Sequence, residues 1–354
     1  METIITKKLS FAMPIERAAQ IYRVINGGGF KMTALDNFEF LKDGTCQIFC
    51  DARNREEWLE KRREGIGGSD AGAVIGINKY KSPMMVYLEK KGILKTEDTP
   101  AMQHGRRMEP VLKKEFPEIY MREYEGDVFV YNSDYMYQST IYPFMLATLD
   151  GIVKGRFGEA GLEIKTASVF EKKEWGGDNI PDPYYAQVQH YMIVTGLKQF
   201  FVLALVGAEI ILKRIPYNSN FAGLLIKKEK QFWEENVLKD QIPAPIGLPG
   251  EDDIIEMMFA GSDETVSIPE LESKAEEYLK IHEQIKDLEE LKRKIQQEIK
   301  LKIGNAKVCF AGGHKITWSR YQQVRIDMDK LKAEAPDIYE RYSKTIETSR
   351  LLIK

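Results

Sequence analysis

The amino-acid sequence predicts an α/β protein whose core is a mixed sheet flanked by helices. The pattern of residues 127–131, Asp-Val-Phe-Val-Tyr, predicts a strand. Residues 199–206 are almost all apolar, as expected for a strand that is buried on both faces. Segments with apolar residues at every third or fourth position lie before and between the strands. This order favours helices packed against a sheet.

Composition and length place the chain among soluble globular proteins. It has 354 residues, of which 43% are hydrophobic and 30% are charged, and this length suits about two domains. We predict no membrane segment, because no apolar run approaches the roughly 20 residues that a bilayer requires. The N-terminus lacks the basic start and apolar run of a secretory signal, so we predict a cytoplasmic protein.

Cysteine content and charge narrow the chemistry further. The three cysteines are too few for a disulfide framework, and no nearby Cys or His pair completes a zinc or iron–sulfur site. The net charge of −3 excludes a bulk polycation but allows local patches that bind phosphate. Short basic clusters occur at residues 61–63, 106–107, 113–114, 172–173 and 227–228.

The first fifty residues form a small N-terminal extension to which the sequence assigns no role. Helical spacing of apolar residues predicts a helix over residues 14–26, which a run of three glycines ends. A short strand is predicted over residues 45–49. A helix over residues 54–63 then carries several basic side chains.

A glycine-rich turn over residues 65–72 follows this basic helix. Ser69 or Asp70 can cap the next helix, which is predicted over residues 71–75. Exposed amides at a helix N-terminus attract anions, so the turn could bind a phosphate. A plain capped turn explains the same residues and is the preferred interpretation from the motif alone. The glycine spacing fits neither a P-loop nor a dinucleotide-binding turn.

The rest of the core is predicted from the same patterns. Glu109 lies in the first turns of one predicted helix, where the helix dipole favours a carboxylate. Residues 243–253 are rich in proline and glycine and predict a linker. The core domain is therefore placed over residues 51–250 and a C-terminal extension over residues 251–354. Helices are predicted at 82–91, 104–116, 185–191 and 220–238, and strands at 144–153, 161–166 and 209–217.

The C-terminal extension begins with a long amphipathic helix over residues 269–303, in which apolar residues recur every three or four positions. This helix could pair as a coiled coil or return antiparallel onto the protein. A hairpin follows, with strands at 307–311 and 315–320 around Gly312-Gly313. A final helical stretch covers residues 328–343.

Two carboxylates and a lysine near the ends of adjacent strands form a candidate site. Asp150 precedes Glu163 by thirteen residues, enough for one turn and a return along the next strand, and Lys165 follows. A hard divalent cation needs such oxygen ligands, and a lysine beside it could orient or activate water. Gln187 and Tyr191 are four residues apart, so both would lie on one face of the following helix. The alternative is that Tyr191 packs in the core and Gln187 is a surface residue.

Six blocks of sequence occur in one order along the chain. They are WLEKR (58–62), GIGGSDA (65–71), GRRME (105–109), ATLDG (147–151), LEIK (162–165) and YAQVQHY (185–191). This set resembles the YqaJ-type viral recombinases, which are related to bacteriophage lambda exonuclease and belong to the PD-(D/E)XK nuclease superfamily. The resemblance covers about residues 54–245. Leu149 stands where the superfamily name has proline, a residue that binds no ligand.

The resemblance implies a restriction-endonuclease-like PD-(D/E)XK core and a metal site within it. Asp150, Glu163 and the Ile164 carbonyl would hold Mg²⁺ or Mn²⁺. Glu109 would complete the acidic site, directly or through water. Lys165 would position the attacking water or help to deprotonate it.

The resemblance also implies residues that contact the substrate. Arg62 and Ser69 match positions that contact the 5′-phosphate of the substrate strand. Gln187 and Tyr191 match the family's Gln-x-x-x-Tyr pattern and would support the substrate or the site.

We therefore expect a metal-dependent deoxyribonuclease, specifically a 5′→3′ exonuclease that resects linear double-stranded DNA ends for phage-type recombination. The open alternatives are an endonuclease of the same superfamily and a DNA-end-binding or scaffold protein that does not cleave. The family also implies a single-strand annealing protein as partner and a ring-like homo-oligomer. It further implies a phage or prophage origin, with the protein acting in the cytoplasm of a bacterial host.

Overall fold

The chain divides into two compact units, Met1–Ile255 and Glu256–Lys354. The structure is a computed structural model that describes residues 38–95, 98–259, 264–345 and 349–353. The helix predicted over residues 14–26 lies outside the described residues. Within them, no helix is both long and apolar enough to cross a membrane.

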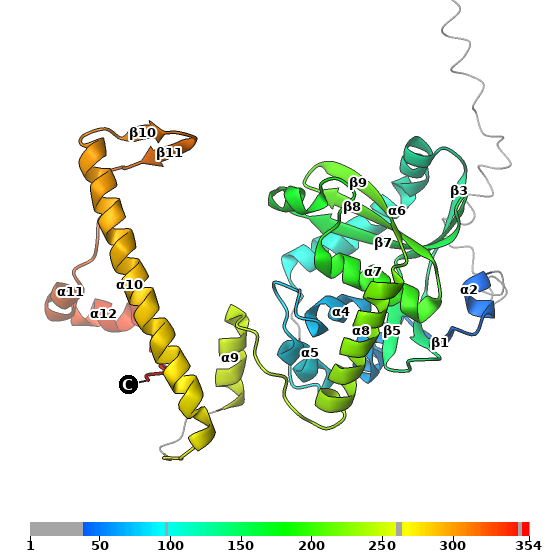
Figure 1. The fold of residues 1–354 in the computed structure, drawn as a ribbon, viewed down its shortest axis with the longest axis horizontal. Coiled ribbons are helices and arrows are strands. Elements are labelled where there is room, and N and C mark those ends of the chain that lie inside the picture. The colour runs from blue at the N-terminus through cyan, green and yellow to red at the C-terminus, as the bar shows by residue number, and fades with distance from the viewer. Residues whose placement is uncertain (1–37, 96–97, 260–263, 346–348, 354) are drawn as a thin grey trace, which may run out of the picture. The chain divides into compact units, whose positions relative to one another are not determined.

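A five-stranded mixed sheet forms the centre of the first unit (Figure 1). The strand order is β3-β6-β7-β8-β9, in which β7 and β8 run parallel and the other neighbours pair antiparallel. Gly161 is required where β7 meets β8, because a side chain there would collide with the Phe200 ring. The strands are β3 (Val128–Tyr131), β6 (Gly151–Gly155), β7 (Gly158–Ala167), β8 (Gln199–Val206) and β9 (Glu209–Pro216).

A second, four-stranded sheet in this unit has the order β1-β4-β5-β2. Its edge strand β2 pairs in parallel with β5, with Ile66 opposite Met145. The chain leaves β5 for β6 of the larger sheet through Leu149 and Asp150, so Asp150 lies where the two sheets adjoin. The strands are β1 (Cys46–Asp51), β2 (Ile66–Gly67), β4 (Tyr135–Ser139) and β5 (Met145–Thr148).

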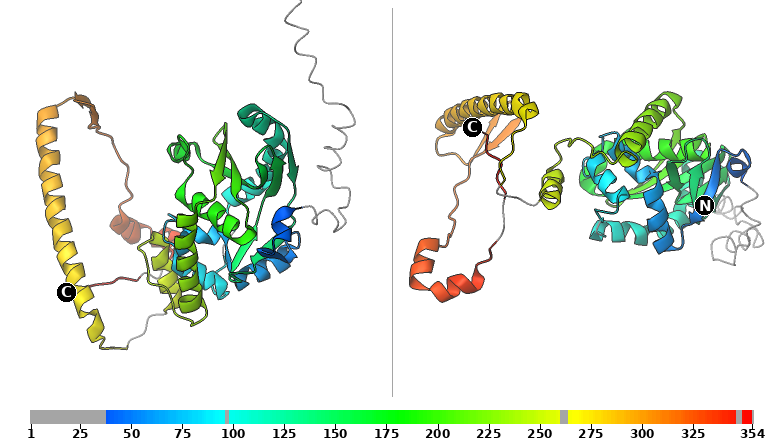
Figure 2. Two further views of the ribbon diagram at one scale, coloured as in Figure 1. Left: turned by 45° about the vertical axis from the view of Figure 1, so that its right-hand side comes forward. Right: turned by 90° about the horizontal axis from the view of Figure 1, so that it is seen from below.

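Helices cover both faces of the five-stranded sheet, as the views in Figures 1 and 2 show. Helix α6 packs on one face, and α7 packs on the other together with α4 and α8. The helices of this unit are α2 (Glu39–Lys42), α3 (Arg55–Lys61), α4 (Gly68–Val74), α5 (Pro83–Lys90), α6 (Pro100–Tyr124), α7 (Asp182–Thr195) and α8 (Ser219–Gln231). Shorter helical turns are η2 (Arg62–Glu64), η3 (Val169–Trp175) and η4 (Phe232–Val237), and α9 (Pro249–Met258) follows.

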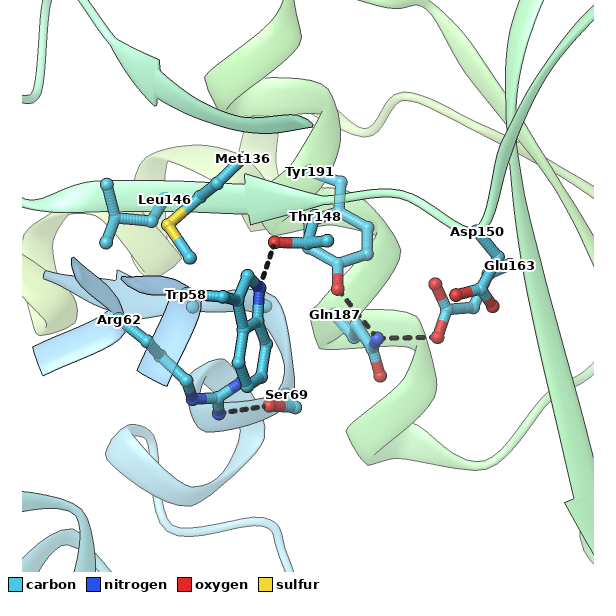
Figure 3. Close-up of a pocket in the computed structure, with 12 residues that line it drawn as sticks. Trp58, Arg62, Ser69, Met136, Leu146, Thr148, Asp150, Glu163, Gln187 and Tyr191 are labelled. Carbon is cyan, nitrogen blue, oxygen red and sulfur yellow. Dashed lines mark hydrogen bonds between the residues drawn. The ribbon is translucent and has the colours of Figure 1, made fainter. Parts of the chain in front are cut away.

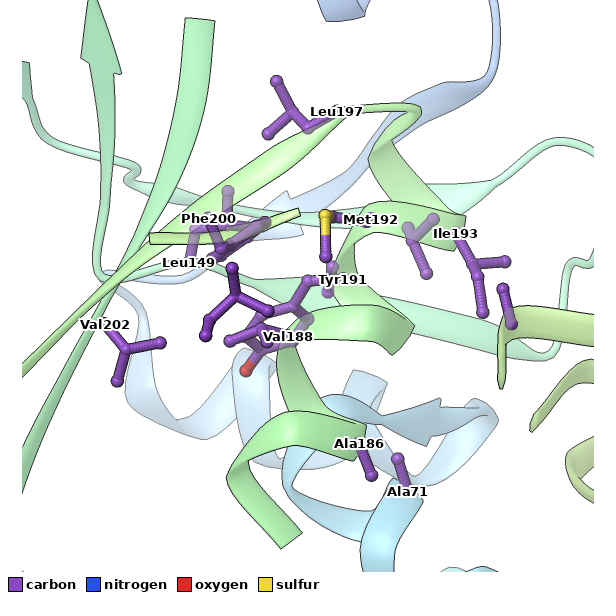
Figure 4. Close-up of a cluster of buried hydrophobic side chains, with 14 of the residues drawn as sticks. Ala71, Leu149, Ala186, Val188, Tyr191, Met192, Ile193, Leu197, Phe200 and Val202 are labelled. Carbon is purple, nitrogen blue, oxygen red and sulfur yellow. The ribbon is translucent and has the colours of Figure 1, made fainter. Parts of the chain in front are cut away.

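Alternation along β7 and β8 divides the hydrophobic core in two. Leu162 and Ile164 pack toward α6, whereas Phe200 and Val202 pack toward α7 (Figure 4). Successive side chains of a strand point to opposite faces, so Glu163 and Lys165 project toward α7. The core thereby fixes which side of the sheet carries the polar residues of the candidate site.

The observed fold confirms the predicted class, a mixed sheet flanked by helices with a long C-terminal helix and a hairpin. The prediction of one strand over residues 144–153 was wrong. The segment forms β5 and β6 in different sheets, because the chain turns at Leu149–Asp150 from one ladder to the other.

Two further boundaries differ from the predictions. Helix α6 begins at Pro100 and ends at Tyr124 instead of spanning 104–116. Thr99 caps its first turn, and the packing of its apolar face on the sheet outweighs the two internal prolines. The last part of the predicted linker over 243–253 is helical, since α9 begins at Pro249. The Glu251 carboxylate accepts three backbone N–H bonds just before this helix, at 2.8–3.0 Å.

The second unit consists of a long helix, a hairpin and two short helices. Helix α10 has 32 residues and ends at Gly304, which has a positive φ of 60°. The predicted hairpin is confirmed, with Ala311 opposite His314 across the two-glycine turn. The elements are η5 (Pro269–Leu271), α10 (Glu272–Ile303), β10 (Val308–Ala311), β11 (His314–Thr317), α11 (Met328–Glu334) and α12 (Pro336–Tyr342).

Candidate active site

The carboxylates of Asp150 and Glu163 lie together at one side of a pocket in the first unit (Figure 3). Asp150 follows β5, and its Oδ2 accepts the Ile164 backbone N–H at 2.6 Å. Glu163 reaches the same place from the middle of β7. The backbone bond fixes Asp150 against β7, so the two carboxylates are held side by side by the sheet itself.

Lys165 and Gln187 hold one oxygen of Glu163. The Lys165 Nζ lies 2.6 Å from Glu163 Oε1, and Gln187 Nε2 donates to the same oxygen at 2.6 Å. Lys165 also lies over the Tyr184 ring, with Nζ 4.8 Å from its centroid. Gln187 Nε2 is 3.0 Å from the Tyr191 hydroxyl. Gln187 and Tyr191 are both buried, which excludes the alternative in which Gln187 is a surface residue.

Burial sets the protonation of this cluster. It raises the pKa of Asp150 well above its usual range, and the neighbouring carboxylates of Glu163 and Glu109 raise it further. Burial likewise raises the pKa of Glu163, although Lys165 opposes the shift. For Lys165 burial alone would lower the pKa, but the two carboxylates raise it above its ordinary value. The charge of Lys165, which is protonated, therefore does not compensate both carboxylates of Asp150 and Glu163.

The free oxygen of Glu163 fits a bound cation. Glu163 Oε2 is buried and has no hydrogen-bond partner among the described residues. An unpaired buried carboxylate oxygen is costly, and a hard divalent cation prefers oxygen ligands of this kind. A cation there would also relieve the repulsion between Asp150 and Glu163. These two residues therefore suit Mg²⁺ or Mn²⁺.

Glu109 and Ile164 were predicted as further ligands. Glu109 lies on α6, where its Oε1 pairs with Lys113 at 3.2 Å, and it acts on Asp150 and Glu163 through its charge. In the described part of the chain, no three Asp, Glu, His or Cys side chains approach closely enough to form a metal-binding group. The Ile164 N–H faces Asp150, and a role for its carbonyl stays a prediction.

Arg62 and Ser69 line the other side of the pocket in Figure 3. Arg62 Nη2 donates to Ser69 Oγ at 2.6 Å, and the guanidinium carbon lies 5.2 Å from the centre of the Trp58 ring. The indole of Trp58 donates to Thr148 Oγ1 at 3.1 Å. The basic helix and the glycine-rich turn thus meet, as the sequence suggested, and present a fixed guanidinium to the pocket.

A buried aspartate anchors Arg62. Asp70 is fully buried and accepts from Arg62 and Lys81 at 2.9 Å and from Lys90 at 2.7 Å. It also accepts the Gly67 N–H at 3.2 Å at the start of α4. Burial alone would raise the pKa of Asp70, but the three cations hold it well below its usual range. The cluster carries an excess of positive charge beside the pocket.

A buried histidine fixes α7 to the strand that leads to Asp150. The His190 Nε2–H donates to the Leu146 carbonyl at 2.9 Å, and Nδ1 lies 2.9 Å from Glu229 on α8. Although burial opposes it, the Glu229 carboxylate raises the pKa of His190. This bridge holds β5, α7 and α8 in one arrangement, and with them the residues that each contributes to the site.

Sequence reasoning missed the cluster around Asp70 and the His190 bridge. Asp70 was considered only as a helix cap, and Lys81, Lys90 and His190 were given no role. One signal was available for Lys90, because it lies four residues after Val86 on the buried face of α5. A lysine on an apolar helix face predicts an acidic partner nearby.

The fold and the site define an α/β protein with a buried carboxylate–lysine centre next to a basic pocket. The model of the YqaJ-like viral recombinase domain matches residues 57–198. The protein YqaJ of Bacillus subtilis (strain 168) is 32% identical over 309 residues, which cover 85% of this chain and 94% of that protein. The chain belongs to the YqaJ-like viral recombinase family.

Two solved structures of one enzyme were also found to be similar. The alkaline exonuclease LHK-Exo from Laribacter hongkongensis is 19% identical with a TM-score of 0.39, covering 57% of this chain and 97% of that chain. Its complex with dAMP is 17% identical with a TM-score of 0.40 and the same coverage.

Proposed function

We propose that this chain is a Mg²⁺- or Mn²⁺-dependent deoxyribonuclease that acts as a 5′→3′ exonuclease on linear double-stranded DNA. One observation carries the proposal: a single pocket is lined by the carboxylates of Asp150 and Glu163 and by Arg62 and Ser69. The carboxylates suit a hard cation, and the guanidinium suits a phosphate. Membership of the YqaJ-like family supports a nuclease role.

The residues at the carboxylate side divide the work of hydrolysis. When bound, the cation supplies neutralisation of the negative charge that builds on the scissile phosphate. Asp150 and Glu163 would hold it, with the Ile164 carbonyl and Glu109 as further ligands. Lys165 is fixed by Glu163 and the Tyr184 ring, and it would position the attacking water. Gln187 would keep Glu163 oriented.

The basic side of the pocket would select the strand end. A terminal 5′-phosphate carries more charge than an internal phosphodiester and offers three oxygens to Arg62 and Ser69. The excess of cations around Asp70 would strengthen this preference. Holding the 5′-phosphate there would place a phosphodiester near Asp150 and Glu163, which gives the 5′→3′ polarity.

The deciding experiment follows end-labelled linear duplex and closed circular DNA with and without Mg²⁺. We expect mononucleotide release from linear DNA only with the cation, and no cleavage by Asp150→Asn or Glu163→Gln variants. An Asp178→Asn variant is the matched control, because this exposed acid lies on the loop before α7. Cleavage of circular DNA would favour an endonuclease, and binding of ends without cleavage would favour a scaffold protein.

Polarity is tested at the other side of the pocket. An Arg62→Gln or Ser69→Ala variant should lose most of its preference for 5′-phosphorylated over 5′-hydroxyl ends. Equal loss on both substrates would contradict the proposed role of the two residues.

A single-strand annealing protein is the expected partner, because the family resemblance implies one. Titration of a purified annealing protein into this chain would test that partner.

A further inference from the structure

Helix α10 has an apolar face that stays exposed to solvent among the described residues of its unit. No residue of α10 is buried, and the same holds for β10, β11, α11 and α12. An apolar surface of this extent marks an interaction site. Six side chains of α10 are between 44% and 65% exposed, namely Tyr278, Ile281, Ile285, Leu288, Leu291 and Ile295.

The spacing of this face is that of a coiled coil. Residues 278, 281, 285, 288, 295 and 299, here called the α10 stripe, are all apolar or aromatic. They follow alternating steps of three and four residues, except that Lys292 takes the place of one apolar residue. A repeat of 3.5 residues keeps a stripe in register with a second helix over its whole length. A single lysine at such a position restricts the partner helix to one register.

Charge along α10 is divided between its halves. Residues 272–290 contain seven acidic and three basic side chains, a net charge of −4. Residues 291–303 contain one acidic and five basic side chains, a net charge of +4. The helix dipole favours this polarity only in the first and last turns. Here the opposite charges meet at the middle of the helix, where Glu289-Glu290 is followed within two residues by Lys292-Arg293-Lys294.

We propose that the α10 stripe is the docking surface for α10 of a second copy of this chain, which packs antiparallel to it. In a parallel pair the acidic half of each helix (net charge −4) would face the acidic half of its partner, and the two basic halves (net charge +4) would also face each other. An antiparallel pair places each acidic half against a basic half, and like charges across an interface are costly. The division of charge therefore selects both the partner and its direction.

Four residues of the α10 stripe match when two antiparallel helices cross at residue 290, the boundary between the charged halves, whereas Tyr278 lies opposite the partner's Lys302. Ile281 then lies opposite the partner's Ile299, and Ile285 opposite the partner's Ile295. Leu288 meets the partner's Lys292, whose aliphatic stem covers it while the ammonium group reaches the acidic residues at the centre. The apolar stripe and the charge pattern thus both fit an antiparallel pair that crosses at residue 290.

The oligomeric state of the full chain tests the proposal. Light scattering should give twice the chain mass of 40.7 kDa. An Ile285→Glu variant should give the single mass, because it places a carboxylate in the apolar seam. A Gln297→Glu variant is the matched control and should stay dimeric, because Gln297 lies on the face opposite the stripe. A monomeric wild type, or an assembly that Ile285→Glu leaves intact, overturns the proposal.

Crosslinking tests the direction. In a Cys309→Ser background only the buried Cys46 and Cys50 remain. Equal amounts of Ile285→Cys and Ile295→Cys proteins are mixed and treated with a short bismaleimide. We expect crosslinked dimers in the mixture and not in either protein alone. Self-crosslinking of the Ile285→Cys protein shows a parallel pair and overturns the antiparallel arrangement. Neither readout depends on DNA cleavage.

Discussion

Replacing Asp70 by asparagine removes the buried negative charge that Arg62, Lys81 and Lys90 share, whereas the second acid of the cluster, Glu89, stays paired with Lys81. Asparagine keeps the size of the side chain and one acceptor oxygen for the Gly67 N–H. It leaves Arg62, Lys81 and Lys90, which lie 2.7–2.9 Å from the Asp70 oxygens, without their shared counter-ion.

The cost depends on how well each cation can reach water or lose its proton. Removing one partner of a buried ion pair costs about 3–5 kcal/mol. Arg62 and Lys81 keep 24% and 21% of their side chains exposed, so both regain some hydration, and Lys81 also keeps its ion pair with Glu89. Lys90 is only 2% exposed, but burial lowers its pKa to about 8, and it can become neutral. We therefore expect a loss near the low end, about 3 kcal/mol in the free energy of unfolding.

Urea denaturation at pH 7 with EDTA measures this loss, and a double-mutant cycle with Lys90→Met assigns it. The double variant should be more stable than the two single effects predict, by at least about 1 kcal/mol, because Lys90 then no longer lacks a partner. Asp98→Asn is the control, since it breaks an exposed pair with Arg106 and should leave stability nearly unchanged. A loss below about 1 kcal/mol for Asp70→Asn, or strict additivity in the cycle, would refute the reasoning.

Three other changes have defined outcomes. Asp150→Asn should abolish cleavage yet stabilise the metal-free protein at pH 7 by about 1 kcal/mol. Because the pKa of Asp150 is raised in the folded state, the folded state binds more protons than the unfolded state. The stability of the wild type should therefore fall as pH rises above the ordinary carboxyl pKa. Thermal melts of the wild type and of Asp150→Asn from pH 4 to 8 check this sign. For Lys90 the folded pKa of about 8 is below its ordinary 10.5, so the unfolded state binds more protons between these values. Relative to Lys90→Met, the wild type should gain roughly 3 kcal/mol from pH 8 to 10.5 in urea titrations, and a flat difference contradicts the buried charge. Gly68→Ala should lower the free energy of unfolding by about 1–3 kcal/mol, because the new Cβ would lie 2.7 Å from Tyr191 Cζ. The control Gly223→Ala, in open space on α8, should be neutral or stabilising. Calorimetry measures both variants.

Local patterns in the sequence were sufficient for β7, the strand that carries Glu163 and Lys165. Glu163 and Lys165 alternate with Leu162 and Ile164, so the face of β7 that carries them follows from the pattern of two. The turn at Asp150 was not predictable, because the apolar run continues through it and only the pairing of β5 and β6 with different strands breaks it. Helix α6 was underestimated for a related reason, since its packing on the sheet overrides its prolines.

The phosphate side of the pocket depends on contacts that sequence spacing does not encode. Arg62 and Ser69 were placed through resemblance. The ion pair of Asp70 with Lys90 joins helices α4 and α5, whose contact is set by tertiary packing, and Lys81 reaches Asp70 from the segment before α5. A buried cluster of this kind appears in sequence only as single charged residues on apolar helix faces. Each such residue predicts that a partner exists but does not identify it.

The expected ring and the proposed α10 pair make different demands on symmetry. Two antiparallel helices that present the same stripe form an isologous contact, which closes at two copies and leaves no free stripe. A ring of three or more copies needs a heterologous contact, in which two different surfaces of each copy meet. The α10 stripe therefore cannot build a ring by itself. A ring contact would lie elsewhere on the chain, whereas the α10 pair alone predicts a particle of two copies that Ile285→Glu separates into single chains.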